Sequence, residues 1–183
     1  ANVAKKMGLP IQKLHITTNQ NDILHTSIHN GLMNKNLVTQ TYSPSMDIQI
    51  SSNFERQLFE SANRNSDKIR DIFQEFSNNG SYALEKDILD NLQSIYSTTA
   101  VNDEKTLSTI KLINDKFDYM ADPHTATGLS VLLNNDKNAT WVSLACAHPA
   151  KFSNAIEKAI GKPAVLPKEL SKLFDKEEKM TIL

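Results

Sequence analysis

The hydrophobic residues follow two periods along the chain, and each period predicts one kind of element. Apolar residues alternate with polar ones around Ile11–Ile16 and form a short run at Thr140–Ala145, which predicts two strands, the second of them central. A helix is predicted from Ile23 to Asn30, between a polar cluster and Gly31. This succession of strands and helices is typical of α/β proteins.

The middle of the chain has a different pattern, in which apolar residues recur only at helical spacing. Residues 66–117 are predicted to form three amphipathic helices, and Asn102 is placed to cap the third. No strand is predicted between these helices. The sequence therefore predicts α/β segments at 1–60 and 119–183, separated by a helical insertion at 61–118.

Local signals mark where several helices begin or end. Gly8, after two lysines, predicts the end of a helix, so we expect the chain to begin inside a larger protein; the alternative is a processed amino terminus. Ser52 followed by Glu55 predicts a capping box at the start of another helix. Further helices are predicted to start at Asp122-Pro123 and at Pro149, the last one ending at Gly161.

The composition narrows the class of protein. Twenty basic residues against twenty-one acidic ones give a net charge of −1, which argues against a dedicated nucleic-acid surface. The single cysteine excludes an internal disulfide framework and a cysteine-based zinc site. No apolar run approaches the roughly 20 residues of a membrane span, and no secretory signal is visible. We therefore expect a cytoplasmic protein with no membrane partner.

Polar residues follow both predicted strands, at Thr18–Asp22 and at Cys146–His148. If the two strands are parallel in one sheet, both clusters lie on the same rim, where open α/β sheets bind ligands. Three interpretations of Cys146 stay open. It is a buried small hydrophobic residue, a weak S–H group that faces a ligand, or a nucleophile with His148 as its base.

A second group of candidates lies in "SPSMDIQISSNFER", which is rich in hydroxyls and amides and contains Arg56 in a first helical turn. Backbone N–H groups at such a helix start can bind an anion, although the same residues can simply cap and turn the chain. His124 either points at the rim or caps its helix. His25 and His29 are four residues apart, which is a weak zinc signal, and no metal site is predicted.

Six segments in a fixed order, "MGLPI", "TTNQNDIL", "SPSMDI", "SSNFER", "DPHTATG" and "CAHPAKF", resemble the carboxyl-terminal half of threonine synthases of the bacterial and fungal type. The resemblance implies part of a three-layer, tryptophan-synthase-β-like fold (fold type II) that uses pyridoxal phosphate (PLP). The implied reaction converts O-phospho-L-homoserine and water to L-threonine and phosphate. The family's Schiff-base lysine lies in its amino-terminal half, so no catalytic residue is expected here and the chain alone should be inactive.

The resemblance also implies roles for particular residues. The family has a threonine beside the pyridine nitrogen where this chain has Cys146, a weaker hydrogen-bonding partner. Asn19 and Asn21 are expected near the cofactor ring. The expected substrate contacts are Ser43, Ser45, Asp47, Ser52, Asn53, Arg56, His124 and Thr125.

Two other functions remain open at this point. One is a binding or assembly module that has the fold but no catalysis. The other is a different fold type II lyase, such as a hydroxy-amino-acid dehydratase, although the "SPSMDI" and "SSNFER" segments argue against it. The expected partners of the first-ranked function are O-phosphohomoserine and the amino-terminal half of the same enzyme.

Overall fold

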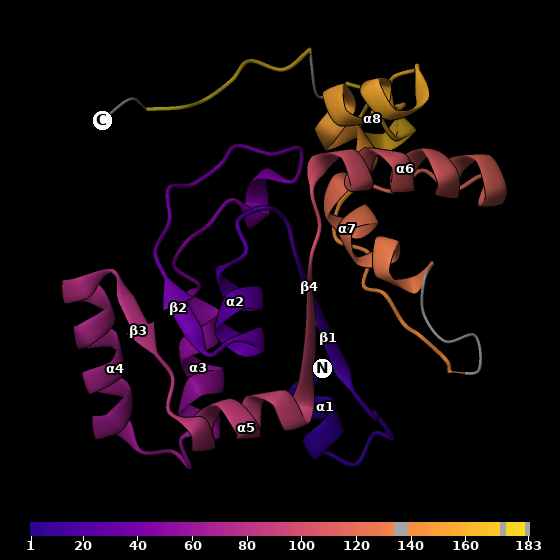
Figure 1. Cartoon of the computed structure of the whole chain (residues 1–183). Coiled ribbons are helices and arrows are strands. Elements are labelled where there is room, and N and C mark those ends of the chain that lie inside the picture. Colours follow the sequence, from indigo (N-terminus) through magenta and orange to yellow (C-terminus); the bar gives the residue numbers. More distant parts are fainter. Residues whose placement is uncertain (134–138, 173–174, 182–183) are drawn as a thin grey trace.

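The computed structural model describes residues 1–133, 139–172 and 175–181 (Figure 1). Two parallel strands, β1 and β4, run through the middle of the molecule, and helices surround them. The α-helices are α1 (Asn2–Lys6), α2 (Ile23–His29), α3 (Ser52–Ser61), α4 (Ser66–Asn79), α5 (Lys86–Ile95), α6 (Asp103–Phe117), α7 (Pro123–Leu132) and α8 (Ser153–Ile160). The strands are β1 (Leu14–Thr18), β2 (Leu32–Asn34), β3 (Ser81–Ala83) and β4 (Tyr96–Ala100). Short 3₁₀ helices occupy Pro44–Met46 (η1), Pro149–Phe152 (η2) and Lys168–Leu170 (η3).

The β1–β4 pair separates the two halves of the molecule. Its register runs from Leu14 opposite Tyr96 to Thr18 opposite Ala100, while β2 and β3 form a separate antiparallel pair. Side chains alternate between the faces of a strand. Ile16 of β1 accordingly packs against the core around α2, and the neighbouring His15 meets Trp141 on the opposite face, with ring centroids 6.3 Å apart.

The prediction that 66–117 contains no strand is wrong, because both β3 and β4 lie within it. The three predicted helices do form, as α4, α5 and α6. Strand β4 starts directly after α5, with no glycine or proline between them. The helical spacing of apolar residues therefore predicts a helix that continues into β4. Its two threonines favour a strand, but the pairing with β1 is a contact between distant parts of the sequence.

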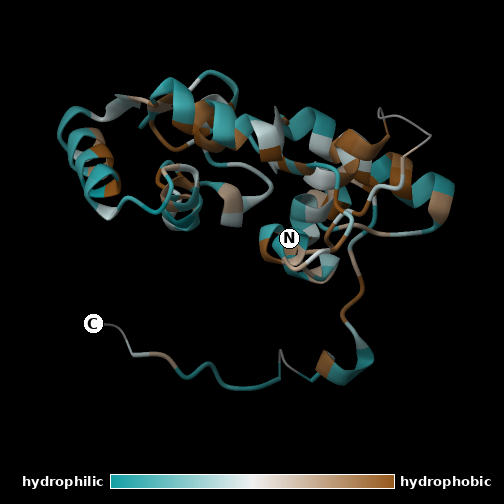
Figure 2. Ribbon diagram, turned by 90° about the horizontal axis from the view of Figure 1, so that it is seen from below, coloured by the Kyte–Doolittle hydropathy of each residue, from teal (hydrophilic) through white to brown (hydrophobic). Residues whose placement is uncertain are grey.

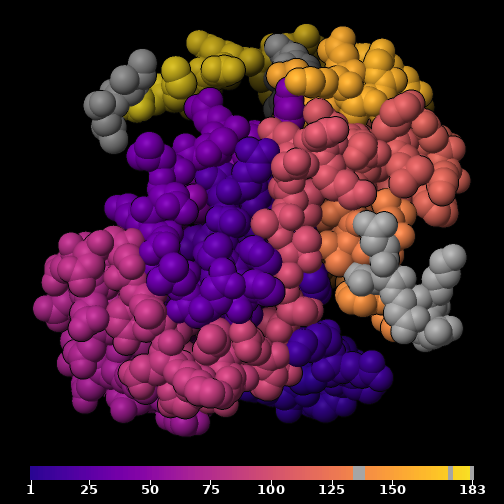
Figure 3. Space-filling model, in the orientation of Figure 1, coloured from indigo at the N-terminus to yellow at the C-terminus, as the bar shows by residue number. Residues whose placement is uncertain are grey.

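The hydrophobic core is divided into two clusters. The larger one joins α2, α3, α4 and α5, and includes Ile28, Leu58 and Leu92. The smaller one joins α6, α7 and α8 through Ile110 and Ile156. Figure 2 shows hydrophobic and hydrophilic residues on different sides of the helices, and Figure 3 shows α8 resting on α6. Since the larger cluster uses residues before and after position 60, segment 61–118 shares its core with the residues that precede it.

The predicted central strand at Thr140–Ala145 is also wrong. These residues have no regular secondary structure, and the side chains of Val142 and Leu144 are 81% and 74% exposed. A strand forms only when a neighbour accepts and donates its backbone hydrogen bonds, and the described part of the chain provides no such neighbour here.

Most predicted helix ends are confirmed. Gly8, Gly31 and Gly161 follow their helices with positive φ angles of 98°, 75° and 76°. The capping box at Ser52 is wrong by one residue: Ser51 is the N-cap and makes no side-chain cap bond. No helix among the described residues has the length and apolar character needed to cross a membrane.

Candidate functional site

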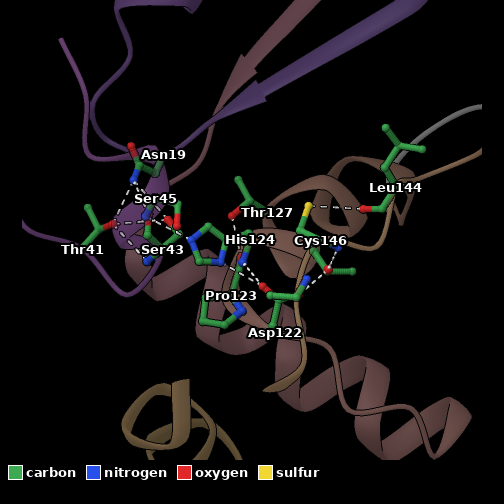
Figure 4. A network of polar contacts seen from close by, with 12 residues as sticks. Asn19, Thr41, Ser43, Ser45, Asp122, Pro123, His124, Thr127, Leu144 and Cys146 are labelled. Carbon is green, nitrogen blue, oxygen red and sulfur yellow. Dashed lines mark hydrogen bonds and ion pairs between the residues drawn. The ribbon is translucent and has the colours of Figure 1, made fainter. Parts of the chain in front are cut away.

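A continuous network of polar contacts joins the end of β1 to the turn at Cys146 (Figure 4). It begins at Asn19 and Asn21, which are buried directly after β1. The amide nitrogen of Asn19 donates to Asp47 Oδ1 at 2.7 Å and to Thr41 Oγ1 at 2.8 Å. Asn21 donates to the same Asp47 oxygen at 3.0 Å. The two amides therefore fix the loop that contains Asp47.

That loop, residues 39–47, is held by several elements at once. Ser43 is buried, and its hydroxyl accepts from Asn19 at 3.1 Å. On the other side of the loop, the Tyr42 N–H donates to Asp103 at the start of α6 at 3.2 Å. Lys158 of α8 donates to the Tyr42 hydroxyl at 2.7 Å. Elements that are distant in sequence thus determine the position of this loop.

His124, in the first turn of α7, connects the loop to the buried carboxylate of Asp122. The backbone N–H of Ser45 donates to His124 Nε2 at 3.2 Å. An acceptor nitrogen carries no proton, so the ring's proton is on Nδ1, which donates to Asp122 Oδ1 at 2.9 Å. The ring of Phe152 packs against His124 with centroids 4.6 Å apart and leaves it little room to rotate.

Asp122 is the N-cap of α7 and is 1% exposed. Its carboxylate accepts from the N–H and Nδ1 of His124, the hydroxyl of Thr125, and the N–H of Ala147 at 3.2 Å. Burial alone would raise the pKa of Asp122, but the hydrogen bonds from Thr125, His124 and Ala147 outweigh it and hold this pKa below its usual value. The group is therefore a carboxylate near neutral pH.

The lowered pKa predicts how stability depends on pH. In the unfolded chain Asp122 has its ordinary pKa of 3.8, whereas the folded value is lower. Its stabilising contribution is therefore complete above about pH 5 and is lost as the pH falls through the folded pKa. We expect the urea midpoint to fall on acidification below about pH 5, and to fall less steeply in Asp122→Asn. An equal slope in both proteins would contradict this assignment.

Cys146 lies at the far end of the network. Its backbone N–H donates to Thr125 Oγ1 at 2.8 Å, and its side chain is exposed, with Sγ 3.6 Å from the Leu144 carbonyl oxygen. The interpretation as a buried hydrophobic residue is therefore wrong. Burial of part of the thiol and the nearby Asp122 charge raise its pKa, which keeps it protonated and a poor nucleophile. His148 Nδ1 instead accepts from the Ala150 N–H at 3.1 Å.

The structure brings most of the predicted site residues together. The network contains eight of them, which are Asn19, Asn21, Ser43, Ser45, Asp47, His124, Thr125 and Cys146. By contrast, Ser52, Asn53 and Arg56 lie exposed at the start of α3, where Arg56 donates to Asn53. Arg56 lines a separate groove of about 640 Å³, together with Phe59 and Phe73.

Thr41 and Asp122 have central places in the network but were not predicted as site residues. Thr41 donates to Asp47 Oδ1 at 2.7 Å, and nothing in its sequence neighbourhood marked it. Asp122 was predicted only as a helix cap. Its second role depends on Cys146 and Ala147, which approach it only in the folded chain.

A cleft of about 530 Å³ opens beside the carboxyl ends of the parallel strands. It lies between the residues that follow β1 and the start of α6, and its lining includes Gln20, Asp22, Asn102 and Lys105. This is the end of a parallel sheet at which α/β proteins bind ligands. Elsewhere, His25 and His29 stack with ring centroids 5.2 Å apart. No group of three or more candidate metal ligands occurs among the described residues.

The fold corresponds to part of the tryptophan-synthase-β-like fold of PLP-dependent enzymes. The PLP-bound threonine synthase of Brucella melitensis has a TM-score of 0.94 and 41% identity, over 100% of this chain and 39% of that one. The yeast threonine synthase has a TM-score of 0.89 and 37% identity, over 97% and 40%. That of Escherichia coli, at 24% identity and a TM-score of 0.66, supports the fold alone.

Sequence comparison agrees with the structural one. A family model described as "Threonine synthase, C-terminal" matches residues 125–183. The threonine synthase of Pseudomonas aeruginosa is 37% identical over 184 residues, which is 99% of this chain and 39% of the relative. The chain belongs to the threonine synthase family and corresponds to its carboxyl-terminal part. It therefore spans about 39% of the length of that relative.

Proposed function

We propose that this chain, together with the amino-terminal part present in its relatives, forms a PLP-dependent lyase. The reaction is the conversion of O-phospho-L-homoserine and water to L-threonine and phosphate. The observation that carries the proposal is the network that fixes the exposed Cys146 turn next to the Ser43–Asp47 loop. The family membership supplies the reaction class.

The residues of the Cys146 turn suit one end of the cofactor. Bound PLP would supply an electron sink for the carbon atoms of an amino-acid substrate. The raised pKa of Cys146 keeps its exposed thiol protonated, so it can offer a weak S–H donor to a pyridine nitrogen. The oxygens of Asp122 already accept from four donors. We therefore propose that Cys146, and not a carboxylate, lies beside the pyridine nitrogen.

The network also refines the proposed binding roles. The side chains of Asn19, Asn21 and Ser43 are buried and engaged with Asp47 and Thr41, so we propose that they shape the site and do not bind directly. The side chain of Ser45 is exposed and is the loop's best candidate for a substrate contact. Ser52, Asn53 and Arg56 remain proposed substrate contacts at the start of α3.

The exposed apolar segment suggests where the amino-terminal part would lie. Val142 and Leu144 are exposed, while Ser143 contacts α7 at Gly128, where an added Cβ would lie 2.8 Å from Ser143 Oγ. We propose that the partner covers the open side of this segment and supplies the missing strand pairing. Burial of the two side chains would then contribute to assembly through the hydrophobic effect.

A chimera tests the proposed function. The carboxyl-terminal part of the Brucella melitensis threonine synthase is replaced by this chain, which matches it over 100% of its length. We expect the chimera to bind PLP and to release phosphate from O-phosphohomoserine with formation of threonine. A folded, PLP-bound chimera that turns threonine into an oxo acid would favour a dehydratase. A folded chimera with neither activity would favour a binding module.

The isolated chain provides a second test. Because the resemblance places the Schiff-base lysine of the family in its amino-terminal half, we expect no detectable threonine formation from O-phosphohomoserine by the pure 183-residue chain. Phosphate release that exceeds a no-protein control would overturn this expectation. The chimera serves as the positive control in the same assay.

The residue at position 146 provides a third test. In the chimera, Cys146→Thr replaces a weak donor by a stronger one with the same kind of contact, so we expect kcat to be preserved within about tenfold. Cys146→Asp would place a carboxylate next to Asp122 and should impair PLP binding. Complete loss of activity in Cys146→Thr, with PLP still bound, would contradict the proposed role.

A further inference from the structure

We propose that Asp122, His124 and Thr125 form a polar relay that couples the Ser43–Asp47 loop to the Cys146 turn. In this arrangement the three are positioning residues, because a displacement of the loop shifts the backbone of the turn, and a displacement of the turn shifts the loop. The proposal rests on the function proposed above, because it assigns the two coupled sides to substrate and cofactor.

The relay is continuous from one backbone to the other. On the loop side, the Ser45 N–H donates to His124 Nε2 at 3.2 Å, and His124 Nδ1 donates to Asp122 at 2.9 Å. On the turn side, the Cys146 N–H donates to Thr125 Oγ1 at 2.8 Å, and the Thr125 hydroxyl donates to Asp122. Both outer donors are backbone groups, so the relay fixes the paths of two chain segments.

The relay has little freedom to adjust. Asp122 is 1% exposed, and each of its oxygens accepts from two donors. Loss of one donor leaves a buried charge less well compensated, and the remaining partners must shift to restore it. His124 is confined by Phe152, whose ring lies 4.6 Å away. A displacement of Ser45 is therefore transmitted to Asp122 and not absorbed by rotation of the imidazole.

The anchors of the loop lead to the same conclusion. Asn19 holds the carboxylate of Asp47, and Asp103 holds the N–H of Tyr42. Ser45 lies between these anchors, on η1, and contacts His124 through its backbone. The loop therefore meets α7 as a fixed body. In the described part of the chain, His124 links that body to Asp122 and so to the Cys146 turn.

Amide exchange at Ser45 tests coupling from the turn side. Thr125→Val removes the hydroxyl but keeps the volume of the side chain. We expect the exchange rate of the Ser45 N–H to rise about tenfold, which is the size of effect typical for contacts within one hydrogen-bond network. Thr125→Ser should restore the wild-type rate. Thr127→Val is the matched control, because the Thr127 hydroxyl is buried on the same helix but donates to the Pro123 carbonyl at 2.8 Å.

Alkylation at Cys146 tests coupling from the loop side. Cys146 is the only cysteine of the 183-residue chain, so iodoacetamide reports on it alone. His124→Leu removes both ring nitrogens, and we expect alkylation to be about threefold faster or more. His124→Asn keeps a donor to Asp122 near the position of Nδ1 but has no acceptor for the Ser45 N–H, so we expect alkylation to be faster than in the wild type here as well.

The proposal is overturned if folded Thr125→Val leaves Ser45 exchange unchanged, or if folded His124→Leu leaves Cys146 alkylation unchanged. Each of the two measurements tests the proposal by itself. If one of the two variants does not fold, the measurement on the other variant is sufficient. Both measurements use the chain without PLP or substrate. Failure of the relay is therefore distinguishable from failure of the proposed enzyme activity, which the chimera measures.

Discussion

Asp122→Ala is expected to destabilise the chain by about 3–5 kcal/mol. The substitution removes a buried acceptor and leaves the hydroxyl of Thr125, Nδ1 of His124 and the N–H of Ala147 without it. It also removes the N-cap of α7. Urea unfolding followed by circular dichroism measures the change in the free energy of unfolding.

An exposed carboxylate provides the matched control for this substitution. Asp115 forms an i,i+4 ion pair with Lys111 at 3.1 Å on the surface of α6. Because solvent screens such a pair, Asp115→Ala is expected to leave the urea midpoint close to that of the wild type. An Asp122→Ala variant no less stable than Asp115→Ala would show that the carboxylate network does not stabilise the fold.

Leu58→Ala is expected to cost about 2–5 kcal/mol, because it creates a cavity in the larger core cluster. Leu58 is 0% exposed on α3 and belongs to the cluster with Ile72 of α4 and Leu92 of α5. The same urea titration measures this loss. Leu37→Ala is the control, since Leu37 is 93% exposed and its truncation should change the stability by less than about 0.5 kcal/mol. Equal effects at the two positions would contradict the assigned core.

Features set by local sequence were predictable from the sequence alone. Gly31 and Gly161 take the positive φ angles that follow a helix, and Asn102 and Asp122 cap helices through their side chains. Such signals act within one helical turn. Ser51 shows their limit, because two adjacent serines offered two positions for the same cap.

Features set by distant partners were not predictable in the same way. Strand β4 forms by pairing with β1, and its residues by themselves read as the continuation of a helix. The apolar run at Thr140–Ala145 was assigned as a strand, yet a strand requires a partner as well as a composition. In both cases the missing information was the neighbour in space.

The sequence predicted that the polar residues after two strands lie together at one edge of a sheet. These residues do lie in one network, but no shared sheet brings them together. The expectation placed Asn19 and Cys146 at the ends of two parallel strands. The structure joins them through His124 and Asp122, whose side chains bridge the loop and the turn. The density of hydroxyl and amide side chains in the sequence identified residues of the Ser43–Asp47 loop as candidates. It did not identify Asp122 as the buried acceptor at the centre of the network.

The parallel pairing of β1 with β4 has a consequence for the order of folding. Leu14 and Tyr96 are partners, although all of α2, α3, α4 and α5 lies between them in sequence. Closing so long a loop before any helix has packed would cost chain entropy with few contacts to offset it. The helices around Leu58 and Leu92 bring the loop ends together as they pack. We therefore predict that the central strands of this molecule pair late in folding, after the helices have packed.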